Sequence, residues 1–221
     1  RTPGRFRTRV LTRGVIPSLH VDYKHSRIKQ YHKEGQALRT ETTINDTRDF
    51  GVGKNLKNLP RLRQIGFSAN RRLLDVQKIT QDCALGEAAF AQVTQPIVVQ
   101  EQRAAGLRYA DPRVQALLSA LLGFVLLVRG FTNRQLRDRL AGLLGQAPES
   151  VTAGRMTYDL RRLRLHGLIE RVPKSHRYRL TTLGTQVALF FSRTYARILR
   201  PGLAQVIPSD WQGCSKLRNS F

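Results

Sequence analysis

The order of patterns in the second half of the chain constrains its fold most. After residue 111 the sequence contains three helical patterns, then two short alternating segments, then a fourth helical pattern. The first is the apolar run Val114–Val128, which follows Pro112, and proline suits the first turn of a helix. The run is shorter than a membrane-spanning helix needs, and charged residues bracket it. It therefore predicts a buried helix over about residues 112–128 and no membrane span.

The next two helical patterns have clear ends. Thr132 and Gln135 have the spacing of a capping box, which satisfies free backbone N–H groups at a helix start, and Gly145 ends this helix. The third pattern covers residues 152–166 and stops at Gly167. Its apolar side consists of Met156, Leu160 and Leu163, and its other side carries Tyr158, Arg161, Arg162 and Leu165, with Arg155 and Arg164 at the margins. We therefore expect a helix that is buried on one side and basic on the other.

Two short strands and a last helix complete this half of the chain. The segments "LIERV" and "RYRLT" alternate as strands, and the loop Pro173–His176 joins them. Candidates to face the core are Leu168, Tyr178 and Leu180. An apolar-faced helix follows and is broken at Pro201-Gly202.

The phrase "YDLRRLRLHGLIERVPKSHRYRLTTLG" resembles the third helix, hairpin and "LT-x-x-G" turn of bacterial winged helix-turn-helix regulators. The resemblance covers about residues 111–200, and we place a winged-helix domain at residues 111–203. It implies that the third helix faces a nucleic-acid groove with Tyr158, Arg161 and Arg162, and with Arg155 at its margin. It also implies that three residues of the hairpin touch phosphates or a minor groove. These are Lys174, His176 and Arg177.

Residues 1–80 predict a small basic α+β module. The segments "RFRTRVLTRGV", "LHVDYKHSRIKQYHKE" and "ALRTETTIND" have strand character, the second as a hairpin, and a turn is expected at Pro17-Ser18. Alternation places Arg27, Lys29, Tyr31 and Lys33 on one strand face. A helix follows, with Leu62, Ile65, Ala69, Leu73 and Val76 on its inner side and Arg61, Arg63, Arg71 and Arg72 around the rest. The fold class we expect is therefore α+β, a β-rich module with a helix followed by the winged helix.

Charge divides the chain in the same way. The 221 residues carry a formal net charge of +23. Residues 1–80 hold 18 basic and 6 acidic side chains, residues 81–110 hold 2 and 3, and residues 111–200 hold 16 and 5. We take residues 81–110 as a connector and residues 204–221, which include Trp211, as a tail or protein-docking segment. So large an excess of positive charge favours a polyanionic partner, with nucleic acid ahead of a membrane surface. DNA is favoured because a basic winged helix reads a duplex groove, and RNA stays open as a partner.

Two cysteines, Cys83 and Cys214, exclude a disulfide scaffold and a four-cysteine zinc site. They indicate free thiols, so we expect a cytoplasmic protein. The chain begins with Arg rather than Met, and we expect a processed product or a piece of a larger protein. A mobile-element or ribonucleoprotein system would fit such a piece.

An enzymatic alternative rests on the histidines of the first module. His20 and Asp22 share a strand face and could ligate one metal ion. The segments "SRIKQYHKEG" and "ALRTETTIN" faintly resemble replication-initiation proteins of small phages and plasmids, which nick single strands with a tyrosine nucleophile and a histidine-held metal. The resemblance implies Tyr31, or else Tyr23, as nucleophile. The usual histidine pair is His20-Val21-Asp22 here, which departs from that pattern.

Other chemistry has little support. "GVGKN" lacks the spacing of a phosphate-binding loop, and no Gly-x-Ser-x-Gly or His-Glu-x-x-His motif occurs. We therefore expect no cofactor and favour a binding protein over an enzyme. A third hypothesis is a winged-helix adaptor that docks on another protein. This hypothesis predicts no salt-sensitive binding to DNA or RNA. Only the nicking enzyme predicts strand cleavage that a chelator and Tyr31→Phe abolish.

Overall fold

The computed structural model describes residues 6–12, 16–33, 37–81, 84–199 and 201. It divides into two compact units. Unit 1 consists of the chain up to Lys78 together with Gly123–Phe131, and unit 2 consists of Ile79–Leu122 and the chain from Thr132 onward. The predicted tail, with Trp211, and both cysteines lie outside the described residues.

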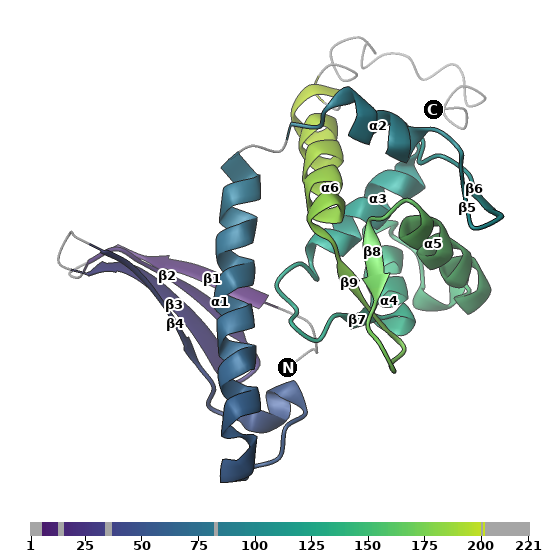
Figure 1. The fold of residues 1–221 in the computed structure, drawn as a ribbon. Coiled ribbons are helices and arrows are strands. Elements are labelled where there is room, and N and C mark those ends of the chain that lie inside the picture. The colour runs from purple at the N-terminus through teal and green to yellow at the C-terminus, as the bar shows by residue number, and fades with distance from the viewer. Residues whose placement is uncertain (1–5, 13–15, 34–36, 82–83, 200, 202–221) are drawn as a thin grey trace. The chain divides into compact units, whose positions relative to one another are not determined.

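Unit 1 contains an N-terminal antiparallel sheet of four strands in sequence order (Figure 1). The strands are β1 (Phe6–Leu11), β2 (Ser18–Tyr23), β3 (Ser26–Lys33) and β4 (Ala37–Thr43). Each predicted strand segment forms a strand, and the hairpin of β2 and β3 forms as expected. The turn expected at Pro17-Ser18 is not as predicted, because Ser18 already pairs with Tyr31 as the first residue of β2.

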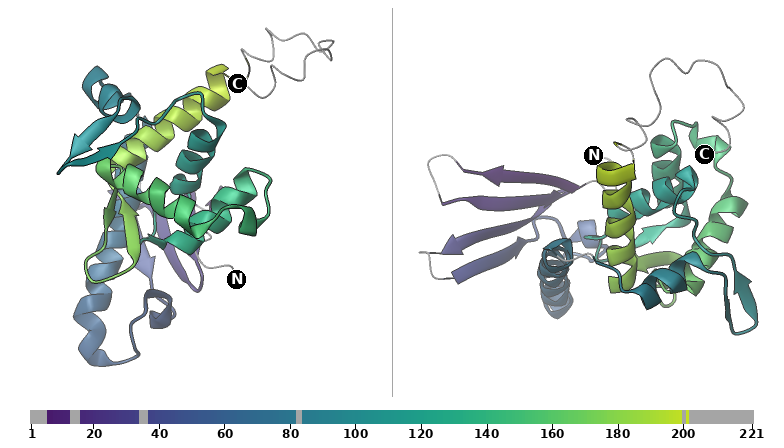
Figure 2. Two further views of the ribbon diagram at one scale, coloured as in Figure 1. Left: turned by 90° about the vertical axis from the view of Figure 1, so that its right-hand side faces the viewer. Right: turned by 90° about the horizontal axis from the view of Figure 1, so that it is seen from above.

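A long helix, α1 (Leu59–Gln81), lies across one face of this sheet (Figures 1 and 2). Two short 3₁₀ turns precede it, η1 (Thr47–Phe50) and η2 (Leu56–Asn58). The core of unit 1 forms where the inner side of α1 meets alternate residues of β2 and β3, and consists of Val21, Ile28, Ala69 and Leu73. Each buried aliphatic side chain of this kind stabilises a fold by about 1.5–3 kcal/mol. Gln30 and Gln77 add two reciprocal amide hydrogen bonds beside it, of 3.0 and 2.6 Å.

The apolar run Val114–Val128 does not form one helix, contrary to the prediction. The helix α3 (Pro112–Leu122) ends before Gly123, and residues 123–131 belong to unit 1. Leu126 and Val128 pack against the core of unit 1. Gly123 lowers helix propensity at this point, and the bulky residues that follow gain more by completing a second core than by extending α3.

Unit 2 contains the helical patterns of the second half. After the boundary strand β7 (Phe131–Thr132) come α4 (Asn133–Leu143) and α5 (Ala153–Leu165), with the 3₁₀ turn η3 (Pro148–Ser150) between them. The capping box of Thr132 and Gln135 is present, and both Gly145 and Gly167 have positive φ, of 64° and 73°. These predicted helix ends are therefore confirmed.

The strands β8 (Ile169–Arg171) and β9 (Arg177–Leu180) pair antiparallel and precede α6 (Thr182–Thr194), which continues as a π-helical turn (Tyr195–Leu199). Thr181 caps α6 by accepting a hydrogen bond from the backbone of Gly184 at 2.9 Å. A Cβ on Gly184 would lie 1.9 Å from the carbonyl oxygen of Leu168, so only glycine fits this contact.

Residues predicted as a connector carry structure of their own. They form α2 (Glu87–Thr94) and a hairpin of β5 (Ile97–Val99) and β6 (Gln102–Ala104), and they belong to unit 2. Val93 and Leu107 are fully buried. Of the helices in the part of the chain that the structure describes, none is long and apolar enough to cross a lipid bilayer.

Candidate nucleic-acid interface

The face of the unit 1 sheet that points away from α1 gathers basic side chains. Side chains alternate along a strand, so the residues next to the core positions project to the opposite face. We call this opposite side the open face. The strand register places six cations on it, Arg7, Arg9, Arg27, Lys29, Lys33 and Arg39, with the two carboxylates Asp22 and Glu41. The predicted alignment of Arg27, Lys29, Tyr31 and Lys33 along one strand face is confirmed by the bounds of β3 and its burial pattern.

Asp22 sits among the cations of this face and holds two of them. Its carboxylate accepts a hydrogen bond from Arg9 at 2.9 Å and from Arg27 at 2.5 Å. Burial raises the pKa of Asp22, but the hydrogen bonds and charges of Arg27 and Arg9 together outweigh burial, so the net pKa lies below the ordinary value. The ionised carboxylate thus fixes two guanidinium groups, and this trio keeps one net positive charge.

His20 lies at the centre of the open face and is buried. Its Nε2 lies 3.0 Å from the hydroxyl of Ser18, and no described atom pairs with its buried Nδ1. Burial lowers the pKa of His20, and three neighbouring cations lower it further against the opposing effect of Asp22. In decreasing order of effect, those cations are Arg27, Lys29 and Arg9. The ring is therefore neutral near pH 7, unlike the cations around it.

Tyr31 is part of the same face. The ammonium group of Lys29 lies 4.5 Å from the centre of its ring, and its hydroxyl donates to Glu41 at 3.2 Å. Glu41 also forms an ion pair with Arg39, whose Nε lies 2.6 Å from a carboxylate oxygen. The Tyr31 side chain is half-buried. Its hydroxyl is bound to the Glu41 carboxylate at the surface of the sheet.

The predicted metal ligands, His20 and Asp22, are not part of the group of possible ligands that converges among the described residues. Asp22 is paired with two arginines, and the pair His20 and Asp22 does not meet a third ligand among the described residues. A different group does converge, because His25, Asp46 and Asp49 place ligand atoms within 4.8 Å of one another.

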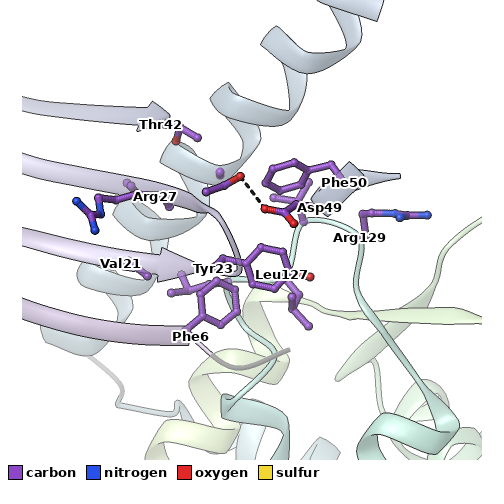
Figure 3. Close-up of a pocket in the computed structure, with 14 residues that line it drawn as sticks. Phe6, Val21, Tyr23, Arg27, Thr42, Asp49, Phe50, Leu127 and Arg129 are labelled. Carbon is purple, nitrogen blue, oxygen red and sulfur yellow. Dashed lines mark hydrogen bonds between the residues drawn. The ribbon is translucent and has the colours of Figure 1, made fainter. Parts of the chain in front are cut away.

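The carboxylates of this second group already accept hydrogen bonds from nearby backbone and side-chain groups. Asp49 accepts from the Ser26 hydroxyl at 3.0 Å, as the dashed line in Figure 3 shows, and from the backbone N–H of His25 at 3.0 Å. Asp46 accepts the backbone N–H of Arg48 at 3.0 Å and so caps η1. These carboxylates hold the turn between β2 and β3 and the start of η1.

Two predicted residues of α1 differ in their surroundings. Arg71 is exposed, whereas Arg72 is half-buried and donates to the backbone carbonyl of Val125 at 3.0 Å. Arg72 therefore anchors the segment that completes the core of unit 1. On the outer side of α1, the guanidinium of Arg63 lies 5.4 Å from the ring centre of Phe67, which is 61% exposed.

The basic side of α5 is only partly available. Arg155 is exposed, and Tyr158 is 50% exposed. Arg161 is exposed and its Nε lies 3.4 Å from the side-chain oxygen of Gln102 in β6. Arg162 donates to two backbone carbonyls, those of Ala105 and Gly106. The structure therefore ties the Arg162 guanidinium down within unit 2 and leaves the other three side chains at the surface.

The sequence analysis missed two residues at α5 that bind other segments of unit 2, His166 and Asp159. His166 is fully buried, and its ring nitrogens lie 2.8 Å from the carbonyl oxygen of Gln92 and 2.9 Å from that of Ala105. On α5, Asp159 is buried and pairs with Arg113 of α3 at 2.6 Å. The sequence signal that could have found them is the position of these two polar residues beside the apolar side of α5.

The loop between β8 and β9 presents the three residues predicted for the hairpin. Lys174 has φ 51° at the tip of the loop. Lys174 and His176 are exposed, and Arg177 is half-buried. Ser175 fixes the loop by donating to the carbonyl of Val172 at 2.9 Å. The loop thus carries basic groups on a turn with its own hydrogen bonds.

Comparison with known proteins adds no family to this geometry. No family model matches the chain, and no curated protein and no solved structure matches it either.

Proposed function

We propose that this protein binds nucleic acid, with duplex DNA as the favoured partner. The observation that carries the proposal is the open face of unit 1, where six cations and only two carboxylates lie on the same side of the sheet. Cations arranged in this way replace condensed counterions along a phosphate backbone, and the released counterions drive binding. The half-buried ring of Tyr31 adds flat surface between the charges, on which a base or sugar can pack.

We further propose that unit 2 from α3 to α6 acts as a winged helix. The order of three helices, a hairpin and a fourth helix supports this, together with the capped start of α4. In such a domain α5 enters a groove and the β8–β9 loop contacts the backbone. Arg155, Tyr158 and Arg161 are the contacts we assign to α5, and Lys174 and His176 are those of the loop. Arg162 leaves this set because its guanidinium binds backbone carbonyls.

The first test is binding measured by fluorescence anisotropy against matched duplex DNA, single-stranded DNA and structured RNA. Between about 50 and 200 mM salt we expect affinity to fall steeply, with a slope that reports the number of phosphates contacted. A clear preference for the duplex supports the winged-helix assignment, and a preference for RNA replaces DNA as the partner. Weak binding that ignores salt and substrate would contradict the proposal and leave protein docking as the function of the basic surface.

A further inference from the structure

A cleft lies at the end of the unit 1 sheet, beside the turn between β2 and β3. Its volume is about 790 Å³, and four cations line it, Arg7, Arg9, Lys24 and Arg27, together with the single carboxylate Asp22. Because strands β1 and β3 flank β2, side chains from both strands and from the turn meet around Asp22. The cleft is therefore a basic site at one end of the open face, apart from Lys29 in the middle of β3 and Lys33 at its other end.

Asp22 holds the guanidinium of Arg27 in the cleft and leaves it donors to spare. Arg27 uses its Nε on Asp22. Its two terminal nitrogens form no hydrogen bond with the residues that the structure describes. Arg7 lies opposite Asp22 in the strand pair and forms no ion pair with any described residue. A planar guanidinium whose donors are fixed in this way matches the oxygens of a phosphate.

The turn that carries Lys24 is held by hydrogen bonds to the two residues that follow Lys24. Its backbone has φ 53°, a left-handed conformation, and Asn45 donates to the carbonyl of His25 at 2.7 Å. Asp49 holds the next residues through the Ser26 hydroxyl (Figure 3). In the same view Arg27 points away from the rings of Phe6 and Tyr23, whose centres are 5.1 Å apart in a stacked pair. The backbone of the turn and the Arg27 guanidinium are thus placed before a ligand arrives, so binding costs less conformational entropy.

We infer that this cleft binds a phosphate group, held between Arg7, Lys24 and Arg27, with Asp22 positioning the guanidinium of Arg27. The inference deepens the proposed function and rests on it, since a nucleic-acid strand would supply the phosphate either at its 5′ end or within its backbone. Both sources present negatively charged non-bridging phosphate oxygens, and inorganic phosphate tests this shared chemistry without a nucleic acid.

The test is an NMR titration of the full chain with inorganic phosphate, matched against chloride at equal ionic strength. We expect saturable shifts of the amide signals of Lys24, His25 and Ser26. The double variant Arg7→Gln/Lys24→Asn should bind phosphate at least about tenfold more weakly, and asparagine suits the left-handed backbone at position 24. The matched control Arg61→Gln/Lys78→Gln removes two exposed cations of α1 and should bind like the parent.

Two results would overturn the inference. The first is a set of shifts equal to those with chloride, and the second is unchanged phosphate binding by the double variant with an intact spectrum elsewhere. The single variant Arg7→Lys keeps the charge but not the planar fork, and we expect it to bind phosphate more weakly than the parent and more tightly than the double variant. Equal binding by all three proteins would also overturn the site.

Oligonucleotides then identify the source of the phosphate. Tighter binding of a 5′-phosphorylated strand than of its 5′-hydroxyl twin, abolished in the double variant, supports a terminal phosphate. Equal binding of both strands, weakened in the double variant, supports a backbone phosphate. If the double variant binds both strands like the parent, the cleft inference fails and the proposed function stands. If phosphate binds but no nucleic acid does, the proposed function fails and the cleft stands as a site for small phosphates.

Discussion

Arginine is used differently in the two units. On the open face of unit 1, Arg7 and Arg27 are exposed, and Asp22 orients the Arg27 guanidinium without using all its donors. On α5 of unit 2, Arg162 binds two backbone carbonyls and Arg161 reaches Gln102. Basic side chains on one side of a helix can therefore bind the protein's own backbone instead of a ligand. A cation count therefore overstates the binding surface of unit 2 more than that of unit 1.

The largest loss of stability is expected where α6 approaches the residue that follows α5 and Gly167. Gly184→Ala places a methyl group against the carbonyl oxygen of Leu168, so we expect unit 2 to become less stable by about 3 kcal/mol through overpacking. Gly154 in α5 has open space around it, and Gly154→Ala should leave stability unchanged or raise it by up to about 1 kcal/mol. Thermal and urea unfolding measure both. Equal stability of the two variants would contradict the close approach at Gly184.

Two neighbouring arginines on α5 should differ in their effects on stability and on DNA binding. Arg162→Ala leaves the carbonyls of Ala105 and Gly106 without their donor, and we expect the free energy of unfolding to fall by about 2 kcal/mol. Arg161→Ala should change stability by less than about 0.5 kcal/mol, because its side chain is exposed, and should weaken DNA binding. Urea unfolding and anisotropy are measured on the same preparations. The assignment is wrong if Arg161→Ala is the less stable variant.

The open face is tested by charge removal on β3, away from the cleft. Lys29→Gln/Lys33→Gln should lower affinity for duplex DNA about tenfold and reduce the salt slope by about two, one for each phosphate that the variant no longer neutralises. Arg61→Gln/Lys78→Gln has the same net charge and serves as the control. A slope that falls equally in both would mean that total charge, and not the face, determines binding.

The smallest expected effect concerns His20 and pH. Its pKa in the folded protein is lowered by burial and by the cations around it, so the unfolded chain takes up a proton at higher pH than the folded one. The contribution of His20 to stability is therefore complete above the ordinary histidine pKa of about 6.5 and falls as pH drops below it. His20→Gln should flatten this fall in melting temperature between about pH 7.5 and 5.5. His32→Gln, at an exposed position of β3, should keep it.

The elements of this fold follow closely from local patterns. Alternation located the four strands, and apolar spacing located α1, α4, α5 and α6, because each element buries one side. The long apolar run was misread, since periodicity reports that residues are buried and not which core buries them. Only Gly123 marks the point where the run divides between two cores.

The candidate site was predictable in part for a similar reason. The basic face of β3 follows from alternation within one strand, so Arg27, Lys29 and Lys33 were found. Arg7 and Arg39 come from neighbouring strands and join that face only through the register, which no single-strand pattern contains. The partners of Arg162 and His166 lie more than fifty residues away in sequence, and no local rule connects them.

The insertion of residues 123–131 into unit 1 has a consequence for synthesis and for dissection of the chain. A ribosome releases the four strands and α1 well before Leu126 and Val128, so the first core stays incomplete while α3 is already being made. A fragment that stops near residue 80 would expose the apolar surface that those two side chains cover, and we expect it to aggregate. The shortest fragment expected to fold must therefore reach beyond residue 131, which makes unit 1 dependent on sequence that follows the first segment of unit 2.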